Sequence, residues 1–283
     1  MSPRRKSPSP IRILPRDIVS NGQLILWRNV ADQPFNETDN WELSASWQSV
    51  SDIPAAYEQL QQQVGTIAQK HSFAWNADFG YLSPNPHHCG IAMSAAGRFH
   101  LEGLGLIGDI DLVLNGLNAI RFEHTNLGKC EERDIARTFD IYSNVVLGIS
   151  ESDLVQLSTR VFNDLITQEI NARRALIEEN PRILEDAISR SLAILRCARM
   201  LCPSEFLDLL SPISIGVAFG FLDGITRKDI QKFNDTYLEL LDDDLHKPVA
   251  IEIRDSRDAH LADIMNKRFQ RVVFNSTAET YFG

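Results

Sequence analysis

His87, His88 and Cys89 are the side chains of this sequence most readily associated with metal binding or nucleophilic catalysis. They lie in the stretch FGYLSPNPHHCGIAMSAAGRFH (79–100), which begins like a strand, turns through prolines and ends in small residues. Three consecutive residues of an extended loop do not easily point at one ion, and no second ligand pair has zinc-like spacing. A nucleophilic Cys89 paired with a histidine would need a third, orienting group, which the sequence does not identify. We therefore expect no metal here, but a solvated or locally hydrogen-bonded loop.

The elements that must position such residues begin with strands. Four strands are predicted, at 23–27, 41–47, 118–124 and 139–148. A helix is predicted at 53–69 from apolar residues at helical spacing, and Ser150 with Asp153 forms a capping box that opens another helix. Strands followed by helices predict an α+β fold in which an antiparallel sheet is flanked by helices.

The chain beyond Pro181 is predicted to be mostly helical. Helices are expected at 183–201, 226–245 and 257–269, the second opened by the capping pair Thr226 and Asp229. We therefore expect four parts: a disordered basic Pro/Ser-rich tail at 1–16, a core at 17–180, a C-terminal helical domain at 181–270 and a tail at 271–283.

The totals of the chain limit the classes of function it can serve. Its 283 residues, 43% hydrophobic and 23% charged, are typical of a globular protein with one large domain or two modest ones. The net charge of −10 argues against nucleic-acid binding, which needs clustered Lys and Arg. No apolar run is long enough to span a membrane, and the first residues lack the apolar core of a signal peptide. We expect a cytoplasmic protein without a membrane or nucleic-acid partner.

The cysteines do not predict a disulfide framework. They are few and irregularly spaced, at positions 89, 130, 197 and 202. Cys197 and Cys202 lie in an apolar helical stretch, and we expect both to be buried free thiols.

Several motifs, in order along the chain, resemble those of the ATP:guanido phosphotransferases, and in particular of the bacterial protein-arginine kinases. DIVSNGQLILWRNVADQPF (17–35) follows the family pattern D-I-V-x-S-S-R-x-R-L-x-R-N-x-x-x-x-P-F without a gap. GYLSPNPHHCGIAMSAA follows G-Y-L-T-x-C-P-T-N-x-G-T-G-L-R-A-S, and LGISESDLV follows L-G-x-S-E. Residues 185–224 resemble the helical C-terminal domain of protein-arginine kinases. The resemblance covers most of 17–35 and 73–269, and it implies a guanido-kinase-like sheet followed by a helical domain, with ATP and Mg²⁺ as cofactors of an active member.

The departures from the family fall on the residues that hold its nucleotide. Guanidinium groups suit a triphosphate because they always carry charge and present a bidentate fork. Phosphoryl transfer itself depends mostly on positioning and electrostatic stabilisation. The resemblance implies that four arginines of the family fall on the neutral residues Gln23, Ile25, Leu43 and Ser94. The family's cysteine near the guanidinium falls on Asn85. We call these five the degenerate nucleotide-site positions. Arg28, Arg98 and Arg121 remain as candidates for anion binding.

The segment between Phe35 and Trp41 is much shorter than in the family, which places most of its small lobe there. Glu37 and Asp39 lie in this segment, and they are either remnants of the family's acidic catalytic pair or exposed loop carboxylates. The resemblance thus implies a catalytic core that lacks most of the small lobe, and no catalytic residue is assigned.

One motif of the family is partly retained near the C-terminus. RDAHLA (257–262) resembles R-D-x-x-R-A, which in protein-arginine kinases contributes to a pocket that recognises phosphoarginine. Arg257 and Asp258 are kept, and the second arginine is replaced by Leu261. The arginine would bind the phosphate and the aspartate the guanidinium N–H groups. The alternative is an ordinary surface ion pair on a charged helix.

Three hypotheses for the function follow. The first is a pseudokinase that binds or regulates a protein partner, an active relative or phosphoarginine-marked proteins, and that forms a homodimer through apolar surface uncovered by the missing lobe. The second is an active ATP-dependent protein-arginine kinase that uses Arg28, Arg98 and Arg121 in a rearranged nucleotide site. The third is an enzyme of another class centred on the His-His-Cys loop. The deficit of positive charge favours the first.

Overall fold

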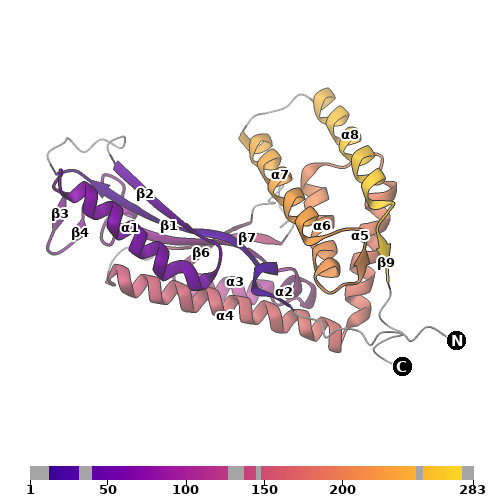
Figure 1. Cartoon of the computed structure of the whole chain (residues 1–283), viewed down its shortest axis with the longest axis horizontal. Coiled ribbons are helices and arrows are strands. Elements are labelled where there is room, and N and C mark those ends of the chain that lie inside the picture. Colours follow the sequence, from indigo (N-terminus) through magenta and orange to yellow (C-terminus); the bar gives the residue numbers. More distant parts are fainter. Residues whose placement is uncertain (1–12, 32–39, 127–136, 145–147, 247–250, 276–283) are drawn as a thin grey trace. The chain divides into compact units, whose positions relative to one another are not determined.

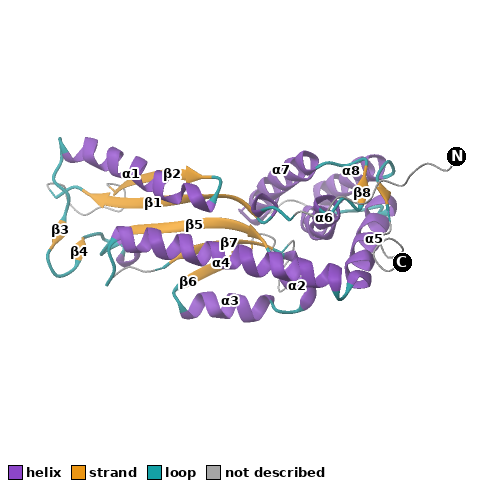
Figure 2. Ribbon diagram, turned by 60° about the horizontal axis from the view of Figure 1, so that its bottom comes forward, coloured by secondary structure: helices purple, strands orange, loops and turns teal. Residues whose placement is uncertain are grey.

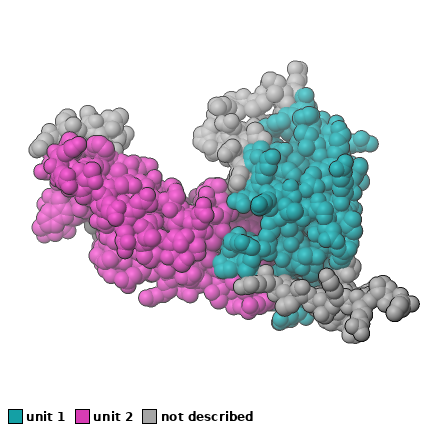
Figure 3. All heavy atoms as spheres, viewed as in Figure 1, with its two compact units in different colours: residues 1–17, 128–136, 175–283 teal, residues 18–127, 137–174 magenta. Residues whose placement is uncertain are grey.

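The structure, a computed structural model, describes residues 13–31, 40–126, 137–144, 148–246 and 251–275 (Figure 1). The described chain divides into two compact units, coloured separately in Figure 3. We call the unit made of residues 18–126 and 137–174 the sheet unit, and the unit made of residues 13–17 and those from 175 onward the helical unit. The division falls between Arg174 and Ala175, inside a long helix and before Pro181.

The sheet unit is built on one five-stranded antiparallel sheet with the order β2-β1-β5-β7-β6. Its strands are β1 (Val19–Asn29), β2 (Asn40–Trp47), β5 (Met93–His100), β6 (Phe122–Asn126) and β7 (Thr138–Ser143). A separate small hairpin pairs β3 (Trp75–Asn76) with β4 (Gly80–Tyr81). The helices of this unit are α1 (Ile53–Ala68), α2 (Glu102–Ile107), α3 (Ile110–Ala119) and α4 (Glu151–Glu178), with 3-10 turns at Val50–Asp52 and Pro86–His88.

The two faces of this sheet differ because successive side chains of a strand point to opposite sides. On one face, apolar residues such as Leu24, Leu26, Ala95 and Phe99 are fully buried. We call this the helix-covered face, since α1 packs on β1 and β2 and α4 runs along the sheet (Figure 2). The intervening residues of the same strands are exposed or half-buried, and we call their side the open face.

Phe162 of α4 is the centre of the core on the helix-covered face. Its ring lies 5.7 Å from the ring of Trp47 on β2, 5.1 Å from Phe99 on β5 and 5.8 Å from Phe122 on β6. Gly22 leaves room for the buried Trp47 indole, because a Cβ at Gly22 would lie 1.9 Å from an indole ring carbon. One helix thus holds three strands of the sheet through aromatic contacts.

The helical unit packs four helices around a leucine-rich core. They are α5 (Pro181–Cys197), α6 (Pro203–Ala218), α7 (Arg227–His246) and α8 (Ile251–Phe269). The inward residues Leu184, Ile188, Leu192 and Leu195 of α5 recur every three or four residues and are all buried, which is the amphipathic pattern of a packed helix. A short 3-10 turn, Pro15–Asp17, and two short strands, β8 (Leu222–Asp223) and β9 (Val273–Phe274), complete the unit.

The α+β fold with a helical C-terminal part is confirmed, and most predicted elements are present. The strand predicted at 118–124 begins later, because Asn118 and Ala119 still belong to α3. Both capping pairs are confirmed: the Ser150 hydroxyl donates to Asp153 at 2.7 Å, and the Thr226 hydroxyl donates to Asp229 at 2.7 Å. The Ser150 bond also lowers the pKa of Asp153.

Two expectations about the helical unit differ from the structure. Cys197 is exposed and Cys202 is half-buried, because Cys197 lies at the end of α5 and Cys202 caps α6 by accepting from the Glu205 N–H at 3.5 Å. The described part of the stretch expected as a tail from 271 contains β9, which pairs with β8 beside the buried Val272. Among the described helices, none combines the length and the apolar character needed to cross a bilayer.

Candidate functional site

Gln23, Ile25 and Ser94 lie together on the open face of the sheet. Ile25 and Ser94 are direct partners across β1 and β5, and Gln23 is two residues from Ile25 on the same side. Neighbouring strands lie about 4.8 Å apart, so these side chains form one contiguous patch. The structure therefore brings together three of the four positions at which the resemblance places missing nucleotide-binding arginines.

The patch is chemically neutral. Gln23 is exposed, and Ser94 donates its hydroxyl to the carbonyl oxygen of Ser143 on β7 at 2.9 Å. Ser44 of β2 pairs with Ile25 and continues the same row. These side chains offer hydrogen bonds and one aliphatic surface, but no fixed charge.

The charged residues of the open face are mostly acidic. Arg98 of β5 binds Asp140 of β7 through two bonds, of 2.9 and 3.0 Å, so its charge is compensated. Glu123 of β6 accepts hydrogen bonds from Tyr142 and Asn144. Glu42 of β2 accepts from the Trp27 indole at 3.1 Å. The strands thus place three carboxylates and one guanidinium on this face.

Arg121 stands at the end of the row that contains Ile25 and Ser94. It precedes β6 with a positive φ of 62°, and its carbonyl oxygen accepts from the N–H of Asn144 at 2.8 Å. By strand register it lies two strands from Ser94, on the order of 10 Å away. Its side chain is exposed. Arg98 and Arg121 are therefore the two sequence-predicted anion-binding candidates that remain near the patch.

Arg28 is directed to the helix-covered face, contrary to its assignment as an anion-binding candidate. Its side chain is 1% exposed and forms an ion pair with Glu151 at the start of α4. Its guanidinium carbon lies 3.5 Å from the centre of the Tyr81 ring, and Nη1 donates to the carbonyl oxygen of Ile91 at 3.3 Å. The physical reason is parity, because position 28 is an odd number of residues from 23 and 25. Arg28 fastens β1 to the segment just before β5 and to α4.

Leu43 does not join the patch either. It pairs with the buried Leu26 across β1 and β2, which places it on the helix-covered face. The register of β2 decides this outcome, and no missing cation of the open face can be assigned to position 43.

The described side chains of the His-His-Cys stretch, His88 and Cys89, do not converge on one point. The ring of His88 stacks on Trp27, with centroids 4.1 Å apart and planes 5° apart. The Cys89 thiol lies 3.4 Å from the carbonyl oxygen of Ser83 and 3.6 Å from that of Asn85. His88 and Cys89 thus contact different neighbours, and the Cys89 thiol is hydrogen-bonded within the loop; the side chain of His87 lies outside what the structure describes. Glu37, Asp39 and Cys130 lie outside the described residues.

The surroundings of Glu151 form a half-buried polar cluster that sequence reasoning missed. Besides Arg28, Glu151 accepts from the Tyr57 hydroxyl at 3.2 Å and from Gln61 at 2.7 Å. Burial, and then the Glu151 charge, raise the pKa of Tyr57 to about 12. The only sequence signal was that Tyr57 and Gln61 are four residues apart on one helix; the link to Glu151 needs the tertiary fold.

In the helical unit, Arg257 and Asp258 of α8 form an ion pair with each other. Arg257 Nη2 lies 3.1 Å from Asp258, whose residue is 6% exposed. Leu261, which stands where the motif has its second arginine, is buried. Burial, and then the charges of the nearby Asp208 and Asp258, raise the pKa of Glu205. The pair therefore lies in locally acidic surroundings.

Comparison with protein families identifies the class of the chain. A family model described as ATP:guanido phosphotransferase, C-terminal catalytic domain, matches residues 34–172. The chain belongs to the ATP:guanido phosphotransferases. A second model, described as Protein-arginine kinase McsB C-terminal domain, matches residues 181–279 and narrows the likeness to the protein-arginine kinases.

Curated relatives agree with this placement. The chain is 29% identical over 195 residues to a protein-arginine kinase of Clostridium acetobutylicum, which covers 69% of this chain and 57% of the relative. It is 31% identical over 183 residues to that of Listeria monocytogenes serotype 4b, covering 65% and 53% respectively. It is 26% identical over 237 residues to the protein-arginine kinase of Syntrophomonas wolfei, an alignment that covers 83% of this chain and 65% of the relative. The chain spans about half the length of the first of these relatives.

Solved structures of guanidino kinases are similar at a lower level. A lombricine kinase matches with a TM-score of 0.46 and 13% identity, covering 62% of this chain and 74% of that one. A duplicated taurocyamine kinase from Schistosoma mansoni matches with a TM-score of 0.45 and 10% identity, covering 67% and 38%. The family assignment rests on the family models and the curated relatives.

Proposed function

We propose that this protein is a pseudokinase of the protein-arginine kinase type, which acts by binding rather than by phosphoryl transfer. The observation that carries the proposal is the open face of the sheet, where Gln23, Ile25 and Ser94 form a neutral patch bordered by three carboxylates. A triphosphate there would meet two arginines at most, and Arg98 is already bound to Asp140. Neutral side chains cannot replace a full charge beside a polyanion.

The expected loss of activity is large. A single arginine that stabilises the transition state of phosphoryl transfer is worth about 10³–10⁵ in rate. Three positions of the patch lack such a charge, and electrostatic stabilisation by fixed groups is commonly the largest catalytic contribution. We infer that the protein needs neither ATP nor Mg²⁺ for its role.

The binding role would be directed at proteins. The candidates are an active relative, another protein partner, a second copy of the chain or a phosphoarginine-marked protein. For the last, Arg257 and Asp258 are the proposed contacts, since a guanidinium suits a phosphate and a buried carboxylate suits a guanidinium. The carboxylates of Glu205 and Asp208 favour the guanidinium end of such a ligand and oppose its phosphate. Calorimetry with phosphoarginine and with free arginine compares the contributions of the phosphate and the guanidinium to binding. If neither ligand gives heat, or if Asp258→Ala leaves the heat unchanged, phosphoarginine binding at Arg257 and Asp258 is rejected.

The second candidate function is an active protein-arginine kinase with a rearranged nucleotide site. The names of the curated relatives favour it, and so does the exposed Arg121 in the row of Ile25 and Ser94. In that case Arg98 and Arg121 would bind the phosphates together.

One titration separates the two functions. Thermal unfolding is followed with and without millimolar Mg-ATP, with an active protein-arginine kinase as the positive control. The pseudokinase proposal expects no shift in Tm for this protein. A clear rise that Arg121→Ala abolishes, or phosphoarginine formed on a generic protein substrate from labelled ATP, would establish the active kinase instead.

A further inference from the structure

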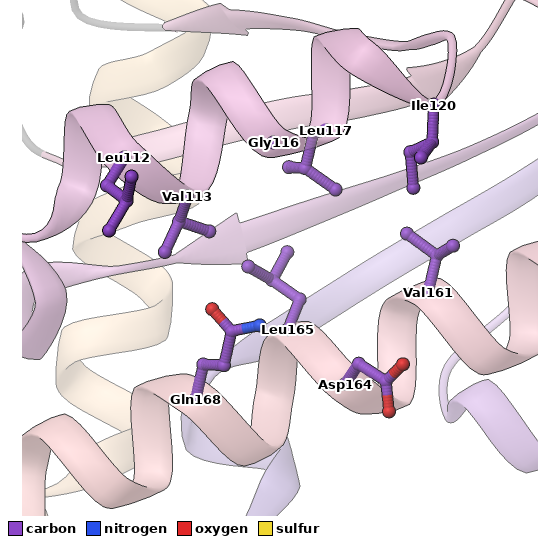
Figure 4. Close-up of a pocket in the computed structure, with 9 residues that line it drawn as sticks. All are labelled: Leu112, Val113, Gly116, Leu117, Ile120, Val161, Asp164, Leu165 and Gln168. Carbon is purple, nitrogen blue, oxygen red and sulfur yellow. The ribbon is translucent and has the colours of Figure 1, made fainter.

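A groove with a largely apolar lining lies between α3 and α4 of the sheet unit (Figure 4). Its volume is about 370 Å³. Its walls are Leu112, Gly116 and Ile120 of α3 and its C-terminal turn, and Val161 and Leu165 of α4. Figure 4 shows these side chains pointing toward one another across the gap without closing it. The groove is separate from the open face and does not depend on whether nucleotide binding is lost.

The lip of the groove on the α3 side is an exposed apolar stripe. Leu112, Gly116 and Ile120 are each four residues apart, so they follow one side of the helix over about 12 Å, or roughly two turns. Leu112 is 74% exposed and Ile120 is 47% exposed. Two helices that line a groove in this way match the recognition mode in which a third, amphipathic helix inserts apolar side chains at the same spacing.

Gly116 opens a hole in the middle of this stripe. A Cβ at Gly116 would meet nothing within 4 Å, so no packing contact requires glycine there. A glycine inside a helix costs about 1 kcal/mol relative to alanine. The hole between Leu112 and Ile120 is of the kind that receives a side chain from a facing helix.

The polar rim indicates the charge of the occupant. Asp164 of α4 lines the groove and is exposed, and no ion pair of its carboxylate is found among the described residues. Asp164 is the one charged residue among those that line the groove; the exposed Arg121 and Arg160 adjoin the lining residues Ile120 and Val161 in sequence but do not line it. A second copy of the chain would bring the same acidic rim to the interface. Charge complementarity therefore favours a different, basic partner.

We propose that the α3–α4 groove binds an amphipathic helix of a partner protein, with a large apolar side chain over Gly116 and a Lys or Arg beside Asp164. The occupant is recognised by a stripe of apolar residues at i, i+4 and i+7 and by positive charge on the flank of that stripe.

The test uses the full chain and two fluorescent helical peptides of roughly 16 residues, about four turns. Both carry the same leucine stripe, flanked by lysines in one peptide and by glutamates in the other. Binding is measured by fluorescence anisotropy at low salt. We expect the lysine peptide to bind at least tenfold more tightly than the glutamate peptide.

Two substitutions with matched controls locate the binding. Gly116→Leu fills the hole, and Gly65→Leu is its control, because Gly65 lies inside α1 and a Cβ there also meets nothing within 4 Å. Asp164→Lys reverses the rim charge, and Glu58→Lys makes the same change at an exposed position of α1. We expect each groove variant to weaken the lysine peptide at least tenfold, and each control variant to leave its affinity within twofold of the parent.

Three results would overturn the proposal. The first is that neither peptide binds, or that both bind equally. The second is binding that Gly116→Leu leaves unchanged. The third is a dimer of the chain in sedimentation that Gly116→Leu dissociates, which would make a second copy the occupant. Thermal unfolding of Gly116→Leu checks that the variant is folded, and because it removes a helix glycine we expect an equal or higher Tm.

Discussion

The two faces of the sheet treat arginine differently. On the helix-covered face, Arg28 is almost completely buried, and Glu151, backbone carbonyl oxygens and the Tyr81 ring surround its guanidinium. On the open face, Arg98 and Asp140 remain about one third exposed, and neutral side chains occupy the neighbouring positions. The same sheet thus has a buried arginine that the fold needs on one face and neutral residues on the other.

The difference teaches which arginines depend on a ligand. A buried guanidinium has a carboxylate that would be left uncompensated without it, so the fold itself requires the residue. An arginine on a solvated face contributes little to stability, and only a bound anion would require it. A chain that no longer binds nucleotide can therefore lose arginines from the open face while it keeps Arg28.

The largest expected effect comes from removing the buried cation. Arg28→Met leaves the Glu151 carboxylate without its guanidinium, and we expect the free energy of unfolding to fall by about 3–5 kcal/mol. Urea denaturation measures this value. The matched control is the double variant Arg28→Met with Glu151→Leu, which removes both charges and should recover much of the loss. A loss below about 1 kcal/mol for Arg28→Met would mean that the two faces do not differ in the way described.

A second buried cation predicts a dependence of stability on pH. Arg173 of α4 pairs with Glu169 at 2.6 Å and donates to Nδ1 of His100 at 3.2 Å. Burial, and then the Arg173 charge, lower the pKa of His100 to about 3. Below pH 6.5, the ordinary pKa of histidine, His100 binds a proton in the unfolded chain but stays neutral in the folded protein. Stability therefore falls as pH decreases from about 6.5 toward 3.

His100→Gln removes this titration. We expect the variant to lose less stability than the parent between pH 6.5 and 4, by an amount on the order of a few kcal/mol, since each pKa unit is worth about 1.4 kcal/mol. Urea denaturation at several pH values gives the two curves. Parallel curves would show that His100 takes up its proton as readily in the folded protein as in the unfolded chain.

The sequence could predict the sheet and the neutral patch but not the polar cluster around Glu151. The alternation in 41–47 and the two capping pairs are local signals, and the structure confirms them. Gln23 and Ile25 share a face because they are two residues apart on one strand. The same parity places Arg28 on the other face, so the sequence itself carries this signal.

The remaining differences needed tertiary information. Leu43 faces the helices because of its register with Leu26, and no local pattern fixes the register of two strands. The partnership of Arg28 with Glu151 joins positions 123 residues apart. Such contacts depend on how α4 packs on the sheet, which periodicity alone does not determine.

Restoring charge to the open face tests the comparison in the other direction. The triple variant Gln23→Arg, Ile25→Arg and Ser94→Arg places three guanidinium groups on one contiguous patch. We expect millimolar Mg-ATP to raise the Tm of this variant by a few degrees, since ligand at ten times its Kd stabilises by about 1.4 kcal/mol, and not to shift the parent. The control is the double variant Ile25→Gln and Ser94→Gln, which keeps Gln23 and places neutral glutamines at all three positions. If Mg-ATP shifts the parent as much as the variant, the patch is not what limits nucleotide binding.

The smallest expected effect is that of the exposed ion pair. Arg98→Ala removes a guanidinium that binds Asp140 where both side chains are about one third exposed, so solvent screens most of their attraction. We expect the free energy of unfolding to fall by about 0–1 kcal/mol, far less than for Arg28→Met. Urea denaturation at low and high salt gives the value, and the small loss should shrink further at high salt. A loss as large as that of Arg28→Met would place Arg98 among the residues that hold the fold, and the open face would then no longer be the side whose charge only a ligand requires.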